Sequence, residues 1–123
     1  AEHLYKLGCY QISLGDTIGK ATPETLIKLY NYLFSEMSET VFAGHFHDTQ
    51  GFALENIELS IESGLKTFDT SIAGLGGCPY APGASGNVAT ERVVRFIEAK
   101  GYQTRINLDM LKEASNFAKE LIE

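Results

Sequence analysis

Short apolar segments alternate along the chain with segments whose apolar residues recur at the spacing of a helix. The apolar segments predict three strands, at residues 9–14, 40–44 and 67–72. The helical segments predict four helices: one that begins at Thr22-Pro23-Glu24, one over residues 51–63, one from Thr90 to about Lys100, and one that begins at Asn107 and Asp109. Strands that alternate with helices in this order favour a parallel sheet with right-handed crossovers.

The predicted helices carry specific signals at their ends. Thr22 offers a hydroxyl N-cap, and Pro23 follows at a position where its missing N–H costs nothing. Gly64 is the expected C-cap of the second helix, and Thr90 the expected cap of the third. The last helix carries apolar residues on one side: Leu111, Ala114, Phe117, Ala118 and Leu121.

Two architectures fit this α/β pattern. Three parallel strands leave open sheet edges, and a (β/α)8 TIM barrel requires about 250 residues. The chain has 123 residues, so it would form under half of a barrel, with the first strands absent. A small three-layer sandwich is the competing architecture, and the periodicity alone does not choose between them.

Composition and charge exclude several classes of protein. The chain is 44% hydrophobic and 21% charged, which is typical of a globular protein and not of a disordered one. Its net charge of −6 excludes a basic surface for nucleic acid. No apolar stretch approaches the roughly 20 residues of a membrane span. Two cysteines suit a reducing compartment, and the N-terminus shows no secretion signal. A chain that lacks an initiator Met suggests a processed protein or an excised piece.

The segment His45-Phe46-His47-Asp48 is the sharpest local signal. Side chains two apart along a strand share a face, so His45 and His47 can converge on one point while Phe46 packs behind them. Histidine is the commonest metal ligand, which makes this pair a plausible metal edge. The alternative is a chance pair of polar residues at the end of a strand.

A glycine-rich loop at residues 73–87 is the second signal. Loops of this length are often lids or binding elements. Within it, Cys78 follows Gly76-Gly77 and precedes Pro79, where a thiol could be presented to a cleft. The alternative for Cys78 is a small buried hydrophobic residue, and the alternative for Asn87 is a plain N-cap.

These signals collect at one edge of the predicted sheet. Asp16 falls at the carboxyl end of the first strand, the histidines at the end of the second, and Cys78 after the third. Parallel α/β proteins place their active sites at this edge. Asp69 alternates with apolar neighbours, so it is either an interior polar residue or part of a solvated face.

The chain resembles the C-terminal part of the hydroxymethylglutaryl-CoA lyase family, within the wider group of metal-dependent TIM-barrel carbon–carbon lyases and synthases. Three segments carry the resemblance: GCYQISLGDTIG at 8–19, HFHDTQGFAL at 45–54, and AGLGGCPYAPGASGNVATE at 73–91. The last segment is the most specific, because related acyl-transferring synthases lack its cysteine-bearing sequence. The resemblance implies that residues 1–123 form a partial TIM-barrel domain containing the last three barrel strands.

The resemblance also implies a reaction and a set of site residues. It implies divalent-cation-dependent cleavage of 3-hydroxy-3-methylglutaryl-CoA to acetyl-CoA and acetoacetate, as in leucine catabolism and ketone body formation. His45, His47 and Asn87 would bind Mg²⁺ or Mn²⁺, and Cys78, Asp16 and His45 would act in catalysis. Nitrogen and oxygen ligands suit these cations better than a thiolate-rich zinc site would. The partner would be an acyl-CoA thioester, and the full-length protein a dimer in the bacterial cytoplasm or the mitochondrial matrix.

The chain departs from the family pattern in what it lacks. An Arg-Asp pair on the family's first barrel strand, whose Asp is a metal ligand, has no counterpart before Gly8. We therefore expect the isolated chain to be inactive. Two alternatives stay open: a related metal-dependent aldolase or acyl-CoA synthase, and a non-catalytic truncated fragment.

Overall fold

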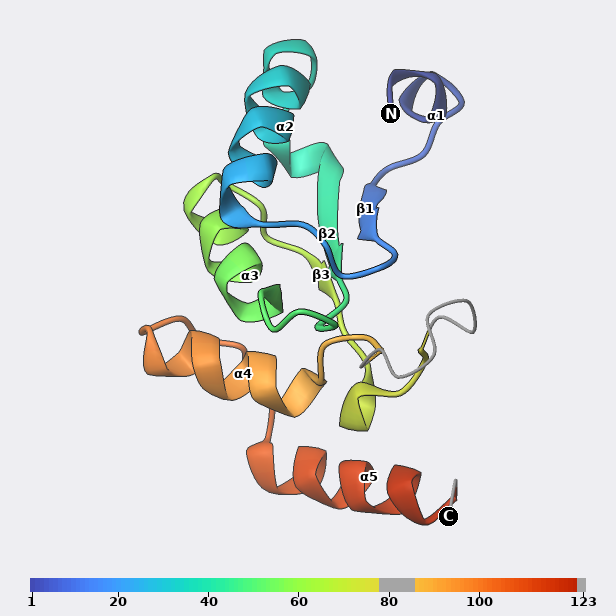
Figure 1. Ribbon diagram of the computed structural model, residues 1–123, viewed down its shortest axis with the longest axis vertical. Helices are drawn as coiled ribbons and strands as arrows, with labels where there is room; N and C mark the ends of the chain where they lie inside the picture. The colour runs from blue at the N-terminus through green and yellow to red at the C-terminus, as the bar shows by residue number, and fades with distance from the viewer. Residues whose placement is uncertain (78–85, 122–123) are drawn as a thin grey trace.

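The computed structural model describes residues 1–77 and 86–121 (Figure 1). Three short parallel strands form one sheet, in the order β1-β2-β3. The strands are β1 (Ile12–Asp16), β2 (Phe42–Phe46) and β3 (Phe68–Asp69). The helices are α1 (Glu2–Lys6), α2 (Pro23–Glu36), η1 (Glu39–Val41), α3 (Ala53–Glu62), η2 (Ile72–Gly74), α4 (Thr90–Ala99) and α5 (Leu108–Glu120).

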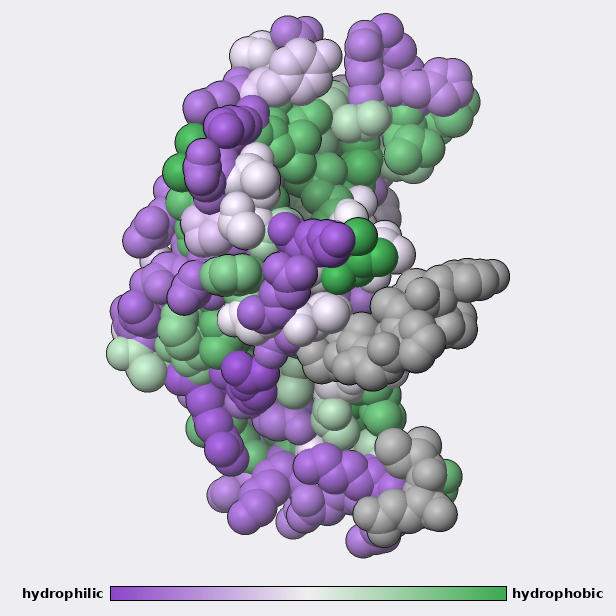
Figure 2. Space-filling model, viewed as in Figure 1, coloured by the Kyte–Doolittle hydropathy of each residue, from purple (hydrophilic) through white to green (hydrophobic). Residues whose placement is uncertain are grey.

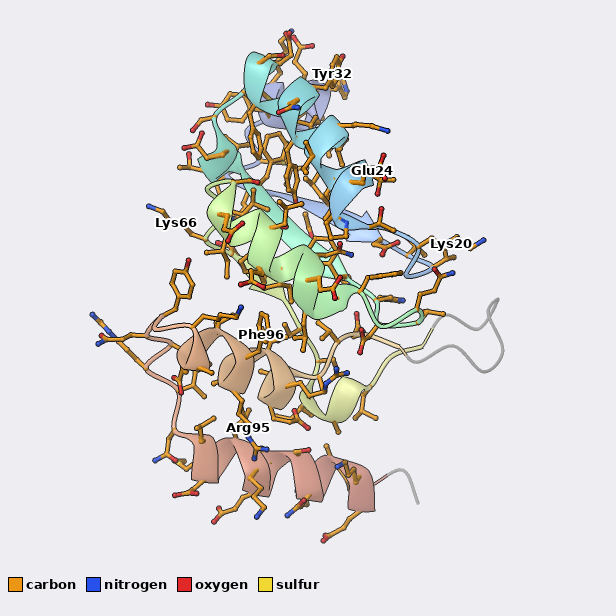
Figure 3. All side chains as sticks on the ribbon, turned by 60° about the vertical axis from the view of Figure 1, so that its left-hand side comes forward. Lys20, Glu24, Tyr32, Lys66, Arg95 and Phe96 are labelled. Carbon is orange, nitrogen blue, oxygen red and sulfur yellow. The ribbon has the colours of Figure 1, made fainter. Side chains whose placement is uncertain are left out.

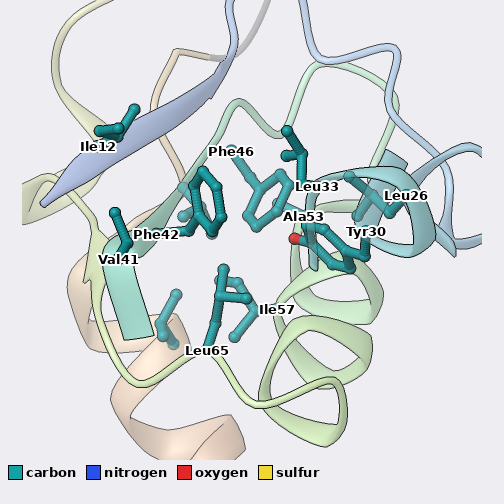
Figure 4. Close-up of a cluster of buried hydrophobic side chains, with 12 residues drawn as sticks. Ile12, Leu26, Tyr30, Leu33, Val41, Phe42, Phe46, Ala53, Ile57 and Leu65 are labelled. Carbon is teal, nitrogen blue, oxygen red and sulfur yellow. The ribbon is translucent and has the colours of Figure 1, made fainter. Parts of the chain in front are cut away.

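Helices α2 and α3 cover one face of the sheet, while α4 and α5 follow below it in Figure 1. Phe42 and Phe46 of β2 point towards the covering helices and are almost fully buried. They pack with Ile57 of α3 and with α2 residues in a single core (Figure 4). The core consists of Ile12, Leu26, Tyr30, Leu33, Val41, Phe42, Phe46, Ala53, Ile57, Leu65, Val88 and Val93.

The opposite face of the sheet carries polar side chains. Alternation along the strands places Ser13, His45 and Asp69 on this face, because each lies next in sequence to a residue that packs towards the helices. Figure 1 shows no helix against this side of the sheet in the part of the chain that the structure describes. Parallel strands connected by helices on one side are the arrangement of a barrel wall.

The predicted helix starts at Thr22 and Asn107 are confirmed. Thr22 is the N-cap of α2 and forms a capping box with Thr25. Asn107 caps α5, and its Oδ1 accepts hydrogen bonds from the N–H groups of Asp109 and Met110. The C-cap of α3 is Ser63 and not Gly64 as predicted, but Gly64 follows it with φ +108°, a conformation that favours glycine, so the helix ends within one residue of the predicted place.

Several predicted boundaries are wrong. The strands end later or earlier than expected: β1 reaches Asp16, β2 reaches Phe46, and β3 ends at Asp69, after which Ser71 pairs with Ala89. Thr90 does not cap α4: the N-cap is Ala89, and the Thr90 hydroxyl instead lies 2.8 Å from that of Thr70. The short helix α1 was not predicted at all.

The apolar side of α5 is largely exposed. Phe117 and Leu121 are 61% and 70% exposed, whereas Ser115 is the buried residue of this helix. Figure 3 shows Arg95 of α4 in the space between α4 and α5. Of the helices described here, none has the length and apolar character needed to cross a membrane.

Candidate metal site

His45 lies at the carboxyl end of β2 with both ring nitrogens engaged. Its Nε2 is 2.8 Å from Oδ1 of Asn87, and its Nδ1 is 3.3 Å from Oδ2 of Asp69. Asp69 is the residue directly beside His45 in the register of β2 and β3. The two contacts therefore fix the plane of the imidazole between β3 on one side and the segment before α4 on the other.

Asn87 is oriented by its own amide group. Its Nδ2 donates to the carbonyl oxygens of Leu75 (3.0 Å) and Gly76 (3.1 Å), so Oδ1 is the atom that faces His45. Gly76 has φ +90°, and a Cβ atom there would lie 2.8 Å from Nδ2 of Asn87. The plain N-cap interpretation of Asn87 is wrong, because Ala89 occupies that position.

His47 joins the same cluster. Its backbone forms an isolated antiparallel bridge with Asn87, and its ring centroid lies 5.6 Å from that of His45. The structure thus brings together all three residues that the sequence proposes as cation ligands. Among the described residues, no group of three or more His, Cys, Asp and Glu side chains could hold a metal ion. The third residue beside His45 and His47 is Asn87, whose side chain offers an amide oxygen.

The donor atoms fit a small divalent cation. Neighbouring ligands of an octahedral ion with bonds of about 2.0–2.1 Å stand roughly 3 Å apart. His45 Nε2 and Asn87 Oδ1 are joined by a hydrogen bond of 2.8 Å, which holds them at about the spacing that two neighbouring ligands would have. Imidazole nitrogens and an amide oxygen are also ligands that Mn²⁺ and Mg²⁺ accept.

Asp16 ends β1 at the same sheet edge, but its carboxylate binds its own loop. Oδ1 and Oδ2 accept hydrogen bonds from the N–H groups of Lys20 (2.9 Å) and Ala21 (3.0 Å). Its register partner is Phe46, one residue beyond His45. A cavity of about 370 Å³ adjoins Asp16 between β1 and α2. It is lined by Leu14, Gly15, Asp16, Ala21, Leu26, Leu29 and Phe46.

Asp48, the last residue of the histidine motif, ties the site to the helices. Its carboxylate accepts hydrogen bonds from the N–H of Ala53 at the start of α3 and from Arg92 of α4. Its own N–H donates to the carbonyl of Gly86, next to Asn87. Asp48 therefore fastens the segment that carries Asn87 against the end of β2.

Cys78 lies outside the described residues. Gly76, two positions before it, accepts hydrogen bonds from both the backbone N–H and the side chain of Asn87. The residues that flank the cysteine segment in the sequence are thus in contact with the proposed ligand cluster.

Sequence reasoning gave no role to Asp69 or Ser13. The hydroxyl of Ser13 donates to Oδ2 of Asp69 at 2.6 Å, the same oxygen that faces His45. The alternation of Asp69 with Phe68 left two interpretations open, an interior polar residue or part of a solvated face. In the structure Phe68 packs against the core, while the Asp69 side chain is 48% exposed. Ser13 could have been noticed from the sequence, because it is a polar residue between the apolar residues Ile12 and Leu14 of β1.

The family model HMGL-like matches residues 1–118. The chain belongs to the HMGL-like family. It is 48% identical over 113 residues to the hydroxymethylglutaryl-CoA lyase of Pseudomonas mevalonii, covering 92% of this chain and 38% of the relative. It is 49% identical to the human mitochondrial lyase, again over 92% of this chain and 35% of the relative.

Solved structures of related lyases share the fold of this chain. The lyase of Brucella melitensis superimposes with a TM-score of 0.94 at 48% identity, covering 98% of this chain and 42% of that one. A lyase of Acinetobacter baumannii in complex with coenzyme A and 3-methylmalate gives 0.87 at 42% identity, covering 98% and 39%. The chain matches part of a TIM barrel, so the barrel prediction is confirmed and the sandwich is excluded. It spans little more than a third of the length of these curated relatives.

Proposed function

We propose that the full-length protein containing this chain cleaves 3-hydroxy-3-methylglutaryl-CoA into acetyl-CoA and acetoacetate, with Mg²⁺ or Mn²⁺ bound. One observation carries the proposal: His45, His47 and Asn87 converge at the carboxyl edge of the sheet in a chain about half identical to lyases of that name. The Gly-Gly-Cys-Pro-Tyr sequence at 76–80 favours this reaction over that of a related aldolase or synthase.

The reaction divides into two proton transfers around one bond cleavage. The tertiary hydroxyl loses its proton, and its oxygen becomes the ketone of acetoacetate as the carbon–carbon bond breaks. The electron pair of that bond passes to the thioester fragment, which takes up a proton and becomes acetyl-CoA. A bound divalent cation would polarise the hydroxyl and orient the substrate.

The residues of the chain would divide these tasks. His45 Nε2, His47 and the Oδ1 atom of Asn87 would hold the cation at the sheet edge. Asp16, whose carboxylate is kept at that edge by two backbone N–H groups, is the proposed acceptor of the hydroxyl proton. Cys78 is the proposed donor to the thioester fragment, a role suited to a thiol with a pKa near neutrality.

The substrate and setting belong to the same proposal. A relative with coenzyme A bound supports an acyl-CoA thioester as the partner. The relatives include bacterial and mitochondrial proteins, which agrees with a place in the bacterial cytoplasm or the mitochondrial matrix. We further propose a dimer of the full-length protein and a role in leucine catabolism and ketone body formation.

Release of acetoacetate by the full-length protein, with and without a chelator, tests the activity. We expect turnover that stops with chelator and returns with Mg²⁺ or Mn²⁺. Undiminished turnover in chelator would refute the cation requirement. If 3-hydroxy-3-methylglutaryl-CoA is not cleaved when the cation is present, the proposed reaction is wrong.

A second measurement locates the cation. His47→Ala should weaken the binding of Mn²⁺ by about 100-fold or more, because a ligand to the ion is lost. Binding is measured as the loss of the paramagnetic signal of free Mn²⁺. His3→Ala is the matched control, because His3 is exposed on α1. Equal affinity in the two variants would contradict the assignment of His47.

A further inference from the structure

Polar side chains cross the uncovered face of the sheet from β1 to β3. Ser13 Oγ donates to Oδ2 of Asp69, and the residue before β1, Gln11, donates through Nε2 to the hydroxyl of Thr67 at 2.9 Å. Strand β2 lies between the partners in both cases. Its residue beside Ser13 is Ala43, whose small side chain leaves room for the contact to pass over it.

The contact between Ser13 and Asp69 continues to His45, a proposed cation ligand. Oδ2 of Asp69 receives the Ser13 hydroxyl at 2.6 Å and faces Nδ1 of His45 at 3.3 Å. The carboxylate is thus fixed from one side and presented to the imidazole on the other. The opposite nitrogen, Nε2, then faces Oδ1 of Asn87.

We propose that Asp69, held in place by Ser13, is a positioning residue that orients His45 so that Nε2 is the nitrogen offered to the cation. This inference rests on the proposed function and adds a determinant of cation affinity to it. A carboxylate that accepts from the non-ligating nitrogen of a histidine fixes the tautomer and the ring plane. Loss of such a partner typically lowers metal affinity about 10- to 100-fold.

The surroundings of Asp69 argue against a purely structural role. Its side chain is 48% exposed in this chain, and it lies on the face without a hydrophobic core. Within the described residues its side chain contacts Ser13 and His45, and neither contact joins it to a covering helix. Removing the carboxylate should therefore affect the histidine more than the stability of the fold.

The test measures Mn²⁺ binding to the full-length protein, three variants and one control variant by electron paramagnetic resonance. We expect a weaker affinity by about 10-fold in Asp69→Asn, which keeps the shape but loses the charge, and by about 100-fold in Asp69→Ala. Ser13→Ala should cause a smaller loss than either, because the carboxylate remains. Asp109→Ala, an exposed aspartate of α5, is the matched control and should bind as the wild type does.

A spectroscopic readout separates positioning from general damage. Electron spin-echo modulation from ¹⁴N counts the imidazoles bound to Mn²⁺; we expect two in the wild type and one strongly coupled nitrogen in Asp69→Ala. Affinity within twofold of the wild type in Asp69→Asn, with two nitrogens retained, would overturn the inference even if Asp69→Ala fails to fold. A wild type that binds no Mn²⁺ would overturn the proposed cation site, and this inference with it.

Discussion

The two faces of the sheet differ in how much of their environment this chain supplies. On the covered face, Phe42 and Ile57 are fully buried by helices from within the same 123 residues. On the opposite face, the side chains of His45 and Asp69 are 35% and 48% exposed. One face carries the hydrophobic core, while the other carries polar side chains that the described residues leave partly exposed.

This difference follows from the way a barrel is built. Each strand of a (β/α)8 barrel packs on its outer side against helices close in sequence, whereas its inner side meets side chains from every other strand. Residues 1–123 therefore complete the outer contacts of three strands but only part of the interior. Leu4 of α1 and Leu7, which follows this helix, are exposed apolar residues, and Figure 2 shows hydrophobic surface in the region of α1. The proposed cation ligand His45 and its neighbour Asp69 lie on the less complete face.

The largest expected effect is the loss of all measurable turnover in the isolated chain. His45, His47 and Asn87 are present, but the family's Arg-Asp pair and the strands that carry it are not. The chain should also self-associate, because β1 and β3 are edge strands here and leave backbone groups unpaired. Acetoacetate release by purified residues 1–123 is the measurement.

Supplying the N-terminal portion of the protein should restore part of the activity if the two pieces assemble into a barrel. Size-exclusion chromatography with light scattering would show whether self-association gives way to a defined complex. Full turnover by the isolated chain would show that the missing strands have no part in the reaction.

Replacement of Cys78 by Ser in the full-length protein should lower kcat by about 10²- to 10⁴-fold and change KM little. The thiol is proposed to act in proton transfer and not in holding the substrate, so its loss should appear in kcat. Cys9→Ser is the matched control, because Cys9 is an exposed free thiol before β1. Alkylation of Cys78 without any loss of rate would exclude it from the reaction.

The covered face was the easier half to predict from sequence. Helical spacing and the signals at Thr22, Gly64 and Asn107 are local, so they identify α2, α3 and α5 without knowledge of the rest of the fold. The predicted ends of helices and strands were wrong where a contact between residues distant in sequence decides them. Thr90, for example, is engaged by Thr70, twenty residues earlier, and therefore does not act as a cap.

The candidate site was predicted as far as strand alternation reaches. The spacing of His45 and His47 indicated that both share a face, and parallel topology predicted that they lie at the same sheet edge as Asp16. Asn87 entered the predicted site only through the family resemblance, and the structure places it against both histidines. The partnership of Ser13 with Asp69 depends on the register of three strands, which periodicity does not give. The side-chain direction of Asp16 likewise depends on the turn that follows β1.

Among the core residues, Ile57→Ala should destabilise the full-length protein by about 2–5 kcal/mol. Ile57 is 0% exposed between α3 and the sheet, and its truncation leaves a cavity there. Tyr32→Ala on the outer side of α2, where Figure 3 shows the ring pointing away from the sheet, should stay within about 0.5 kcal/mol. Urea unfolding of both variants gives the comparison, and equal losses would mean that the core is not confined to the covered face.

The smallest expected effect concerns Glu91, which joins α4 to η2 and α5. Its carboxylate accepts the Ser115 hydroxyl at 2.6 Å and the N–H of Ala73 at 3.2 Å. Burial alone would raise the pKa of Glu91, but the hydrogen bonds from Ser115 and the backbone together hold this pKa below its ordinary value of 4.5. Because the folded state holds the proton less tightly than the unfolded one, the stabilisation is present above pH 4.5 and is lost as the pH falls through the folded pKa. Glu91→Gln should therefore narrow the stability difference between about pH 5.5 and pH 3.5 in urea unfolding. Glu24→Gln, exposed on α2, should leave that difference unchanged. If the free energy of unfolding falls equally steeply with decreasing pH in Glu91→Gln and in the wild type, the hydrogen bonds of this carboxylate do not stabilise the fold.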